Sequence, residues 1–301
     1  MSAFKVAVIV MLVAVGTDSA SAQDRPARVA RFSGDVSIGW YTVYDALPKR
    51  LTFREEEVSI SRGVKAPSRI KGELRGVLEY PAGSVLGIVL KADGRATIAE
   101  RLSALGALDA NDVEALVVVG KCDLPELRLI SRFGRLRELT VAVDESLEGE
   151  EGCTILEGLK NLRYLNVAVD DGCVFGSRRF CTAILALREL RFLSVPCEKF
   201  TESDIILLSS HSALESINLR ARRPVCGSKS LEALRAVKNL RELFVVCTDS
   251  IRDIDVLAFA DVRQLETLQI ATRAPISCQE RIKERRPDCW FFFQEPSGEA
   301  Q

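Results

Sequence analysis

Two stretches of the chain, KNLRYLNVAVDD at residues 160–171 and KNLRELFVVCTD at residues 238–249, share their opening letters and their apolar positions. They begin at residues 160 and 238, and the difference of 78 is three times 26. This spacing predicts that the chain between them is built from similar units of about 26 residues each.

The first stretch carries a pattern of apolar residues that begins at Leu162. Counted from Leu162 as position 1, the apolar positions are 1, 4 and 6, namely Leu162, Leu165 and Val167. The same pattern recurs in both directions, with starts at residues 85, 113, 136, 162, 190, 214, 240 and 265. Alternation at positions 4 and 6 predicts a strand, and apolar residues three and four apart in the following segment predict a helix. The residue nine positions before each of the last six starts is also apolar and falls in the predicted helix. These residues, which were not used to find the pattern, are Leu127, Cys153, Cys181, Ile205, Leu231 and Val256.

The first 22 residues have the layout of a secretory signal peptide. Lys5 precedes an apolar run at residues 6–15, and Ala20-Ser21-Ala22 forms a cleavage signal. The alternative is an uncleaved anchor, but ten residues span only about 15 Å as a helix, roughly half of a bilayer core. We therefore expect an exported protein, periplasmic, cell-surface or secreted, with no transmembrane segment after cleavage.

The L-x-x-L-x-L units resemble leucine-rich repeats with helices on the convex side, and with the leader the chain is similar to exported bacterial leucine-rich-repeat proteins. The resemblance covers residues 85–293. It implies an α/β solenoid, a horseshoe with a parallel sheet on its concave side and helices on its convex side. One feature departs from the family, because the Asn that usually follows the strand is missing. Its equivalents are Asp144, Asp170, Glu198, Arg222, Thr248 and Arg273.

The two ends of the chain do not follow the pattern. Residues 23–84 contain alternating segments such as Val36, Ile38, Trp40 and Thr42, which predict a β-rich N-terminal cap or small flanking module. At the other end, residues 289–293 are expected to form a last strand whose aromatic residues cover the final core. Residues 294–301 are expected to be a disordered tail.

Composition argues against several classes of function. The chain has 301 residues and a net charge of −1, from 41 Lys+Arg against 42 Asp+Glu, which offers no electrostatic case for nucleic acid. It contains one histidine, His211, which lies among serines in LSSHSAL and is interpreted as structural. No nucleophile, phosphate-loop or metal motif is present, so we expect no catalytic residue, metal or cofactor.

The resemblance implies that strand positions 3 and 5 face the concave side, where partners bind. The residues predicted to bind a partner are Tyr164, Asn166, Phe192, Ser194, Asn218, Arg220 and Phe244. Tyr164 and Phe192 share a column and are expected to touch, either as exposed recognition residues or as a pair that only stabilises the sheet. The expected function is a binding scaffold for a protein or other macromolecular ligand. The alternative is a structural envelope or surface component that self-associates.

Two further patterns leave alternatives open. Arg137, Arg163 and Arg191 form either a basic strip for an acidic ligand or a solvated row paired with acidic residues. Nine cysteines lie after the leader; Cys153 and Cys181 fit a core column, where a free thiol acts as a small hydrophobe. Neighbours in a second column form either disulfides or free thiols: Cys173, Cys197, Cys226, Cys247 and Cys278.

Overall fold

The computed structural model of the chain describes residues 27–32, 40–44, 70–73, 77–81, 85–92, 96–169, 175–196, 199–221, 228–247, 257, 261–271 and 276–294. The predicted signal peptide and the residues after 294 lie outside this part of the chain. So do Val36 and Ile38 of the predicted N-terminal strands.

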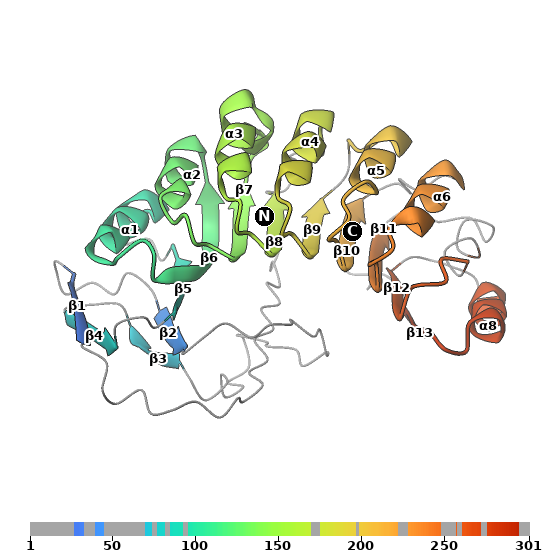
Figure 1. Ribbon diagram of the computed structural model, residues 1–301, viewed down its shortest axis with the longest axis horizontal. Helices are drawn as coiled ribbons and strands as arrows, with labels where there is room; N and C mark the ends of the chain where they lie inside the picture. Colours follow the sequence, from blue (N-terminus) through green and yellow to red (C-terminus); the bar gives the residue numbers. More distant parts are fainter. Residues whose placement is uncertain are drawn as a thin grey trace, which may run out of the picture.

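Most of the described chain alternates between strand and helix. In Figure 1 the helices lie side by side along one side of an arched row of strands. The elements of this region are β5 (Val85–Lys91), α1 (Ile98–Ala104), β6 (Val113–Cys122), α2 (Leu124–Ser131), β7 (Glu138–Val143), α3 (Glu150–Gly158), β8 (Tyr164–Val169), α4 (Arg178–Ala186), β9 (Phe192–Pro196), α5 (Glu202–Leu208), β10 (Ser216–Ala221), α6 (Ser228–Ala236), β11 (Glu242–Cys247), β12 (Thr267–Ala271), α8 (Ile276–Arg285) and β13 (Trp290–Gln294).

The strands β5 to β13 form one open parallel sheet in chain order. The pairing places Leu139 opposite Leu165, Leu165 opposite Leu193, and Leu193 opposite Ile217. The same row continues through Leu243 and Leu268. These residues all occupy position 4 of the sequence pattern, so the register of the sheet agrees with the alignment drawn from the sequence.

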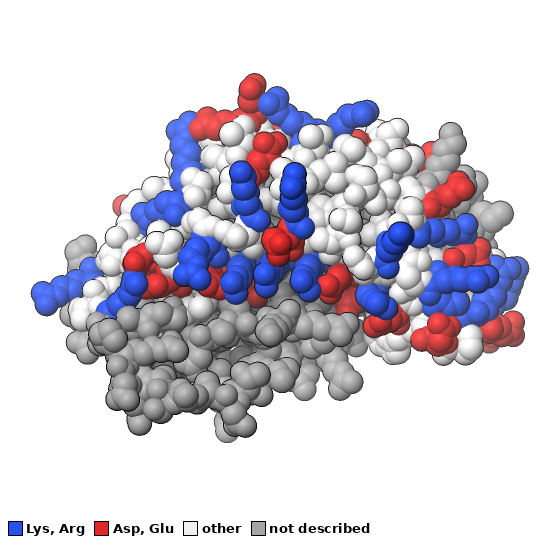
Figure 2. Space-filling model, in the orientation of Figure 1, with Lys and Arg blue, Asp and Glu red and all other residues white. Residues whose placement is uncertain are grey.

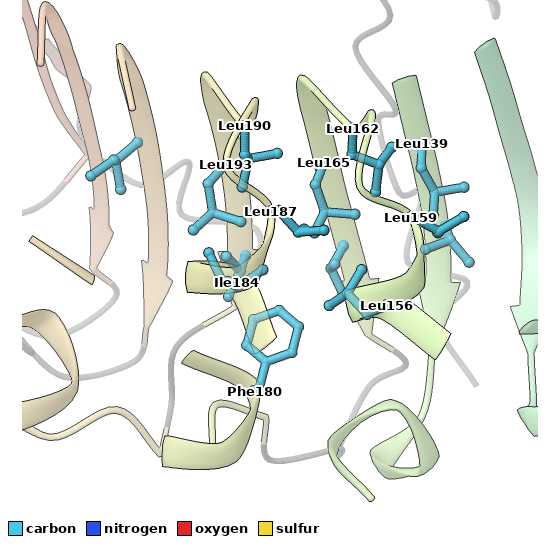
Figure 3. Close-up of a cluster of buried hydrophobic side chains, with 14 of the residues drawn as sticks. Leu139, Leu156, Leu159, Leu162, Leu165, Phe180, Ile184, Leu187, Leu190 and Leu193 are labelled. Atoms are coloured by element: carbon cyan, nitrogen blue, oxygen red, sulfur yellow. The ribbon is translucent and has the colours of Figure 1, made fainter. Parts of the chain in front are cut away.

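The apolar positions of strands and helices meet in one continuous core. Leu165 and Leu193 are fully buried, and Figure 3 shows them on neighbouring strands beside Ile184 and Leu187, with Phe180 on the adjoining helix. The predicted helical column is buried at the four positions whose side chains the structure describes: Leu127, Cys153, Cys181 and Ile205. No single unit could bury its apolar side alone, so each unit depends on its neighbours for stability.

Several helices begin with a side-chain cap that the sequence specifies. At α1 the backbone N–H of Glu100 donates to Thr97 Oγ1 (3.2 Å), and Glu100 Oε2 accepts from the backbone N–H of Thr97 (2.8 Å). The same reciprocal arrangement joins Thr201 to Asp204 at α5. Such a capping box satisfies two backbone donors that the first helical turn leaves unpaired, and so fixes where the helix starts.

Side chains in the turns before six of the strands, β7, β8 and β10 to β13, bind the preceding unit. Asn161 Nδ2 donates to the carbonyl of Gly134, and Asn239 Nδ2 donates to the carbonyl of Ser212, both at 2.7 Å. Both asparagines are the second letter of the repeated phrase KNLR. The same turn in other units uses other donors: Arg132 to Leu102, His211 to Leu187, Gln264 to Val237 and Arg286 to Val262. In these six units a carbonyl of the preceding turn is therefore bonded by a side chain that lies before the strand.

His211 takes part in this row of turn contacts. Its ring is buried, Nδ1 accepts from the backbone N–H of Ala213 (3.3 Å), and Nε2 lies 2.9 Å from the carbonyl oxygen of Leu187. Because Nδ1 accepts, Nε2 carries the proton and donates it to Leu187. The geometry agrees with the structural interpretation of this residue.

The N-terminal strands extend the architecture at one end. β2 (Trp40–Tyr44) pairs antiparallel with β5, and β3 (Ile70–Glu73) pairs with β2, so both add to the edge of the main sheet. β1 (Ala27–Arg31) and β4 (Val77–Pro81) form a separate antiparallel pair. Ala30 and Phe32 are buried in the same core as the helices, so this region shares the main core.

The last strand differs from its prediction in one respect. β13 covers residues 290–294, one residue later than expected, and Cys289 is buried just before it. Phe291 packs partly buried against the core, but Trp290 is 49% exposed. The expectation that the aromatic residues together cover the final core is therefore wrong for Trp290, because it lies in register with Thr267 rather than with the buried Leu268.

Candidate binding surface

The sheet has a second face, turned away from the helices, which we call the far face. Alternation along each strand sends Leu165 and Val167 into the core and leaves Tyr164 and Asn166 on the far face. The register aligns these residues in two columns. The first contains Ala115, Glu138, Tyr164, Phe192, Ser216, Glu242, Thr267 and Trp290; the second contains Val117, Thr140, Asn166, Ser194, Asn218, Phe244, Gln269 and Phe292.

The predicted binding residues all lie on this face, but not with the expected exposure. The rings of Tyr164 and Phe192 stack with centroids 4.2 Å apart and planes 6° from parallel, so the expected contact is present. However, Tyr164 is only 8% exposed and Phe192 only 6%. The interpretation of both as exposed recognition residues is wrong, because stacking and burial make them part of the packed sheet. Burial also raises the pKa of the Tyr164 hydroxyl.

The polar residues beside this aromatic pair have unused hydrogen-bonding capacity. Asn166 and Asn218 are partly buried, and Ser194 and Ser216 are buried. Neither Asn218 Oδ1 nor Ser216 Oγ has a hydrogen-bond partner among the described residues. Phe244 is partly exposed and lies next to Asn218 in the second column. The surface at β10 and β11 therefore combines a partly exposed aromatic ring with the partly exposed side chain of Asn218, whose Oδ1 atom is itself shielded from solvent.

Arg220 has a structural contact that its sequence position did not reveal. Its guanidinium Nη2 donates to the carbonyl oxygen of Val167, two strands away in β8. The intervening strand carries Pro196, which is in register with Arg220. The backbone N–H of Phe192 donates to the carbonyl of Arg163, the residue just before β8. This bond recurs at every second residue of a parallel pair, so the carbonyl of Val167 would accept from a backbone N–H at position 196. Proline has no N–H, and Arg220 supplies the missing donor.

Glu138 is an acidic residue of the far face whose protonation equilibrium is strongly shifted. Burial raises the pKa of its carboxyl to about 7, and the nearby charge of Glu114 adds to the rise. Glu114 is itself buried and forms an ion pair with Arg137 (3.0 Å). Glu138 thus changes charge near neutral pH, whereas an ordinary carboxyl is fully ionised there.

We expect Glu138→Gln to change how stability depends on pH. A raised pKa means that the folded protein prefers the protonated form, so ionisation costs stability as the pH rises from about 5 through 7. Glu138→Gln removes this cost and should raise the free energy of unfolding by about 1–3 kcal/mol at pH 8, with little gain at pH 5. Urea unfolding at both pH values measures it. Glu280→Gln, at an exposed position on α8, is the control, and an equal gain at pH 5 and pH 8 would contradict the assignment.

The arginine row is paired along its length. Arg163 contacts Glu189 (3.3 Å) and Arg191 contacts Glu215 (3.0 Å). Arg137 contacts Glu114, as described above. On the face drawn in Figure 2, Lys and Arg side chains are interspersed with Asp and Glu. The geometry supports the solvated, ion-paired row.

Four cysteines are buried free thiols: Cys122, Cys153, Cys181 and Cys289. Burial raises the pKa of Cys153 to about 11 and that of Cys181 to about 12, so both stay protonated and pack as small apolar groups. The predicted disulfide column is not described: Cys173, Cys197, Cys226 and Cys278 lie outside the described residues, as does the side chain of Cys247. Disulfides and free thiols both remain predictions there.

The described ranges contain neither a candidate metal site nor a candidate membrane span. No group of three or more His, Cys, Asp or Glu side chains is placed there to hold a metal ion. Among the helices of that part of the chain, none is long and apolar enough to cross a membrane. In comparisons with known proteins, no family model matches the chain, and no curated protein matches it.

Proposed function

We propose that the chain is an exported, non-enzymatic recognition scaffold of the leucine-rich-repeat type, with a horseshoe-shaped sheet whose far face binds a protein or other macromolecular ligand. One observation carries the proposal. The far face presents aromatic and amide side chains in register across successive strands, while the helices of the described residues all lie on the other side of the sheet.

The energetics favour β10 and β11 as the centre of binding. The buried Tyr164–Phe192 stack packs β8 against β9, and a surface ordered before binding loses less conformational entropy when a partner binds. Asn218 is partly exposed, so its amide group offers a polar contact to a partner at the same place. Phe244 adds apolar area beside it. The paired arginine row argues for a neutral or mixed surface on the partner and against nucleic acid.

The test is capture of ligands from an envelope or cell-surface extract of the native source. The double variant Asn218→Ala, Phe244→Ala should retain at most about a tenth of wild-type capture, corresponding to the loss of about 1.4 kcal/mol of binding energy. The matched control is Ile206→Ala, which removes a 40% exposed apolar side chain from α5 on the helical side. Unchanged capture by the double variant would contradict the proposal, and so would an equal loss in the control.

A further inference from the structure

The last strand, β13, lies at an end of the 11-stranded sheet. It pairs with β12 on one side, and no described strand pairs with its other side. Its sequence is WFFFQ, which contains no charged residue, glycine or proline. The opposite end of the sheet is β3, whose sequence IKGE contains two charges and a glycine. Charges and irregularities are what usually protect a sheet edge from pairing, so the sequence of β3 carries such protection and the sequence of β13 carries none.

The backbone of β13 shows which groups face outward. The N–H of Trp290 donates to the carbonyl of Glu266 (2.9 Å), so the backbone groups of Trp290 point toward β12. Because these groups alternate in direction along a parallel strand, the N–H and C=O groups of Phe291 and Phe293 point away from β12. Two residues, one on each side of Phe292, therefore present donors and acceptors at the edge.

We propose that β13 pairs with β13 of a second copy of the chain, antiparallel, across a two-fold axis at Phe292. In this arrangement Phe291 lies opposite the partner's Phe293, and Phe293 lies opposite the partner's Phe291. Each of these pairs exchanges two backbone hydrogen bonds, as hydrogen-bonded pairs of an antiparallel ladder do. The outward-facing groups of each copy then bind those of the other.

The occupant is a second copy because the edge is complementary to itself. The three phenylalanines are symmetric about residue 292, so aromatic residues pair with aromatic residues across the axis. The absence of charge in the strand means that the axis brings no like charges together. Trp290, about half exposed, would gain cover at the junction. Two-fold dimers are also the commonest assembly of identical chains. This interface uses the sheet edge and does not depend on the far face as a binding surface.

The test is the molar mass of the full chain in solution over a wide range of concentration, measured by light scattering and sedimentation equilibrium. We expect twice the mass of the chain at high concentration. Phe292→Glu and Phe292→Lys each place like charges across the axis and should weaken the dimer at least about tenfold. A mixture of the two variants places opposite charges there and should restore the dimer. Ile206→Glu, on the helical side, is expected to dimerise like the wild type.

Three results would overturn the proposal. One is a wild-type protein that stays monomeric at all concentrations. Another is a dimer that either Phe292 variant leaves as strong as in the wild type, which would place the interface elsewhere. The third is a mixture of the two variants that stays monomeric. The mixture also guards against a folding defect, because two misfolded variants cannot restore a specific dimer, and far-UV circular dichroism checks each variant separately.

Discussion

Gly152→Ala should destabilise the protein by about 3 kcal/mol or more, because the added methyl group has no room. Gly152 is buried in α3, and a Cβ atom there would lie 2.4 Å from the carbonyl oxygen of Ser146 and 2.6 Å from the Cα of Leu147. Both atoms belong to the backbone of the short helix at Glu145–Glu148, so neither can rotate away. The methyl group fits only if α3 and this segment move apart. That movement would open the core between β7 and β8.

The same helix offers the control. Gly158 ends α3, and a Cβ atom there would meet nothing within 4 Å. Gly158→Ala should therefore be neutral or stabilise by up to about 1 kcal/mol, since alanine favours the helix. Chemical denaturation of both variants provides the comparison. Equal stability of Gly152→Ala and wild type would show that α3 does not pack against the segment before it as described.

Arg220→Met should cost about 1–3 kcal/mol, because it leaves the Val167 carbonyl without a donor inside the sheet. The loss should depend on Pro196. In a Pro196→Ala background the restored N–H can bond to Val167, as the parallel pattern requires, and the guanidinium becomes dispensable. Arg220→Met should then cost less by at least about 1 kcal/mol, a coupling that a double-mutant cycle measures.

The cycle separates this explanation from a simpler one. If Arg220 stabilised the sheet only through packing of its long side chain, Arg220→Met would cost the same in both backgrounds. Pro196→Ala alone should lower stability only slightly, by about 0.5–1 kcal/mol, because alanine has more freedom in the unfolded chain. An absence of coupling would mean that the Val167 carbonyl is satisfied in some other way.

The core and the register were predictable because they follow from a local rule. Apolar residues at positions 4 and 6 of each unit must leave water, and only in-register stacking buries them all together. Leu139, Leu165 and Leu193 therefore align in the sheet as they do in the sequence. The turn contacts of Asn161 and Asn239 come from a shared letter of KNLR, but the resemblance to leucine-rich repeats placed the expected asparagine after the strand.

The candidate site was harder to predict because exposure depends on the whole surface. The sequence pattern placed Tyr164 and Phe192 side by side, but it could not show that both rings would be buried. The contact of Arg220 depends on a proline in one strand and a carbonyl in another, which no single unit contains. The raised pKa of Glu138 likewise depends on burial and on Glu114 in the adjacent strand, and these become neighbours only in the folded sheet.

The central claim is that successive units stack their strands in parallel and in register. Nuclear magnetic resonance of the isotope-labelled protein tests it most directly, through backbone contacts between neighbouring strands. We predict a continuous series of contacts linking Leu139 to Leu165, Leu165 to Leu193, Leu193 to Ile217, Ile217 to Leu243, and Leu243 to Leu268. A series that is antiparallel, shifted by one residue, or absent between successive units would contradict this architecture and every surface assigned from it.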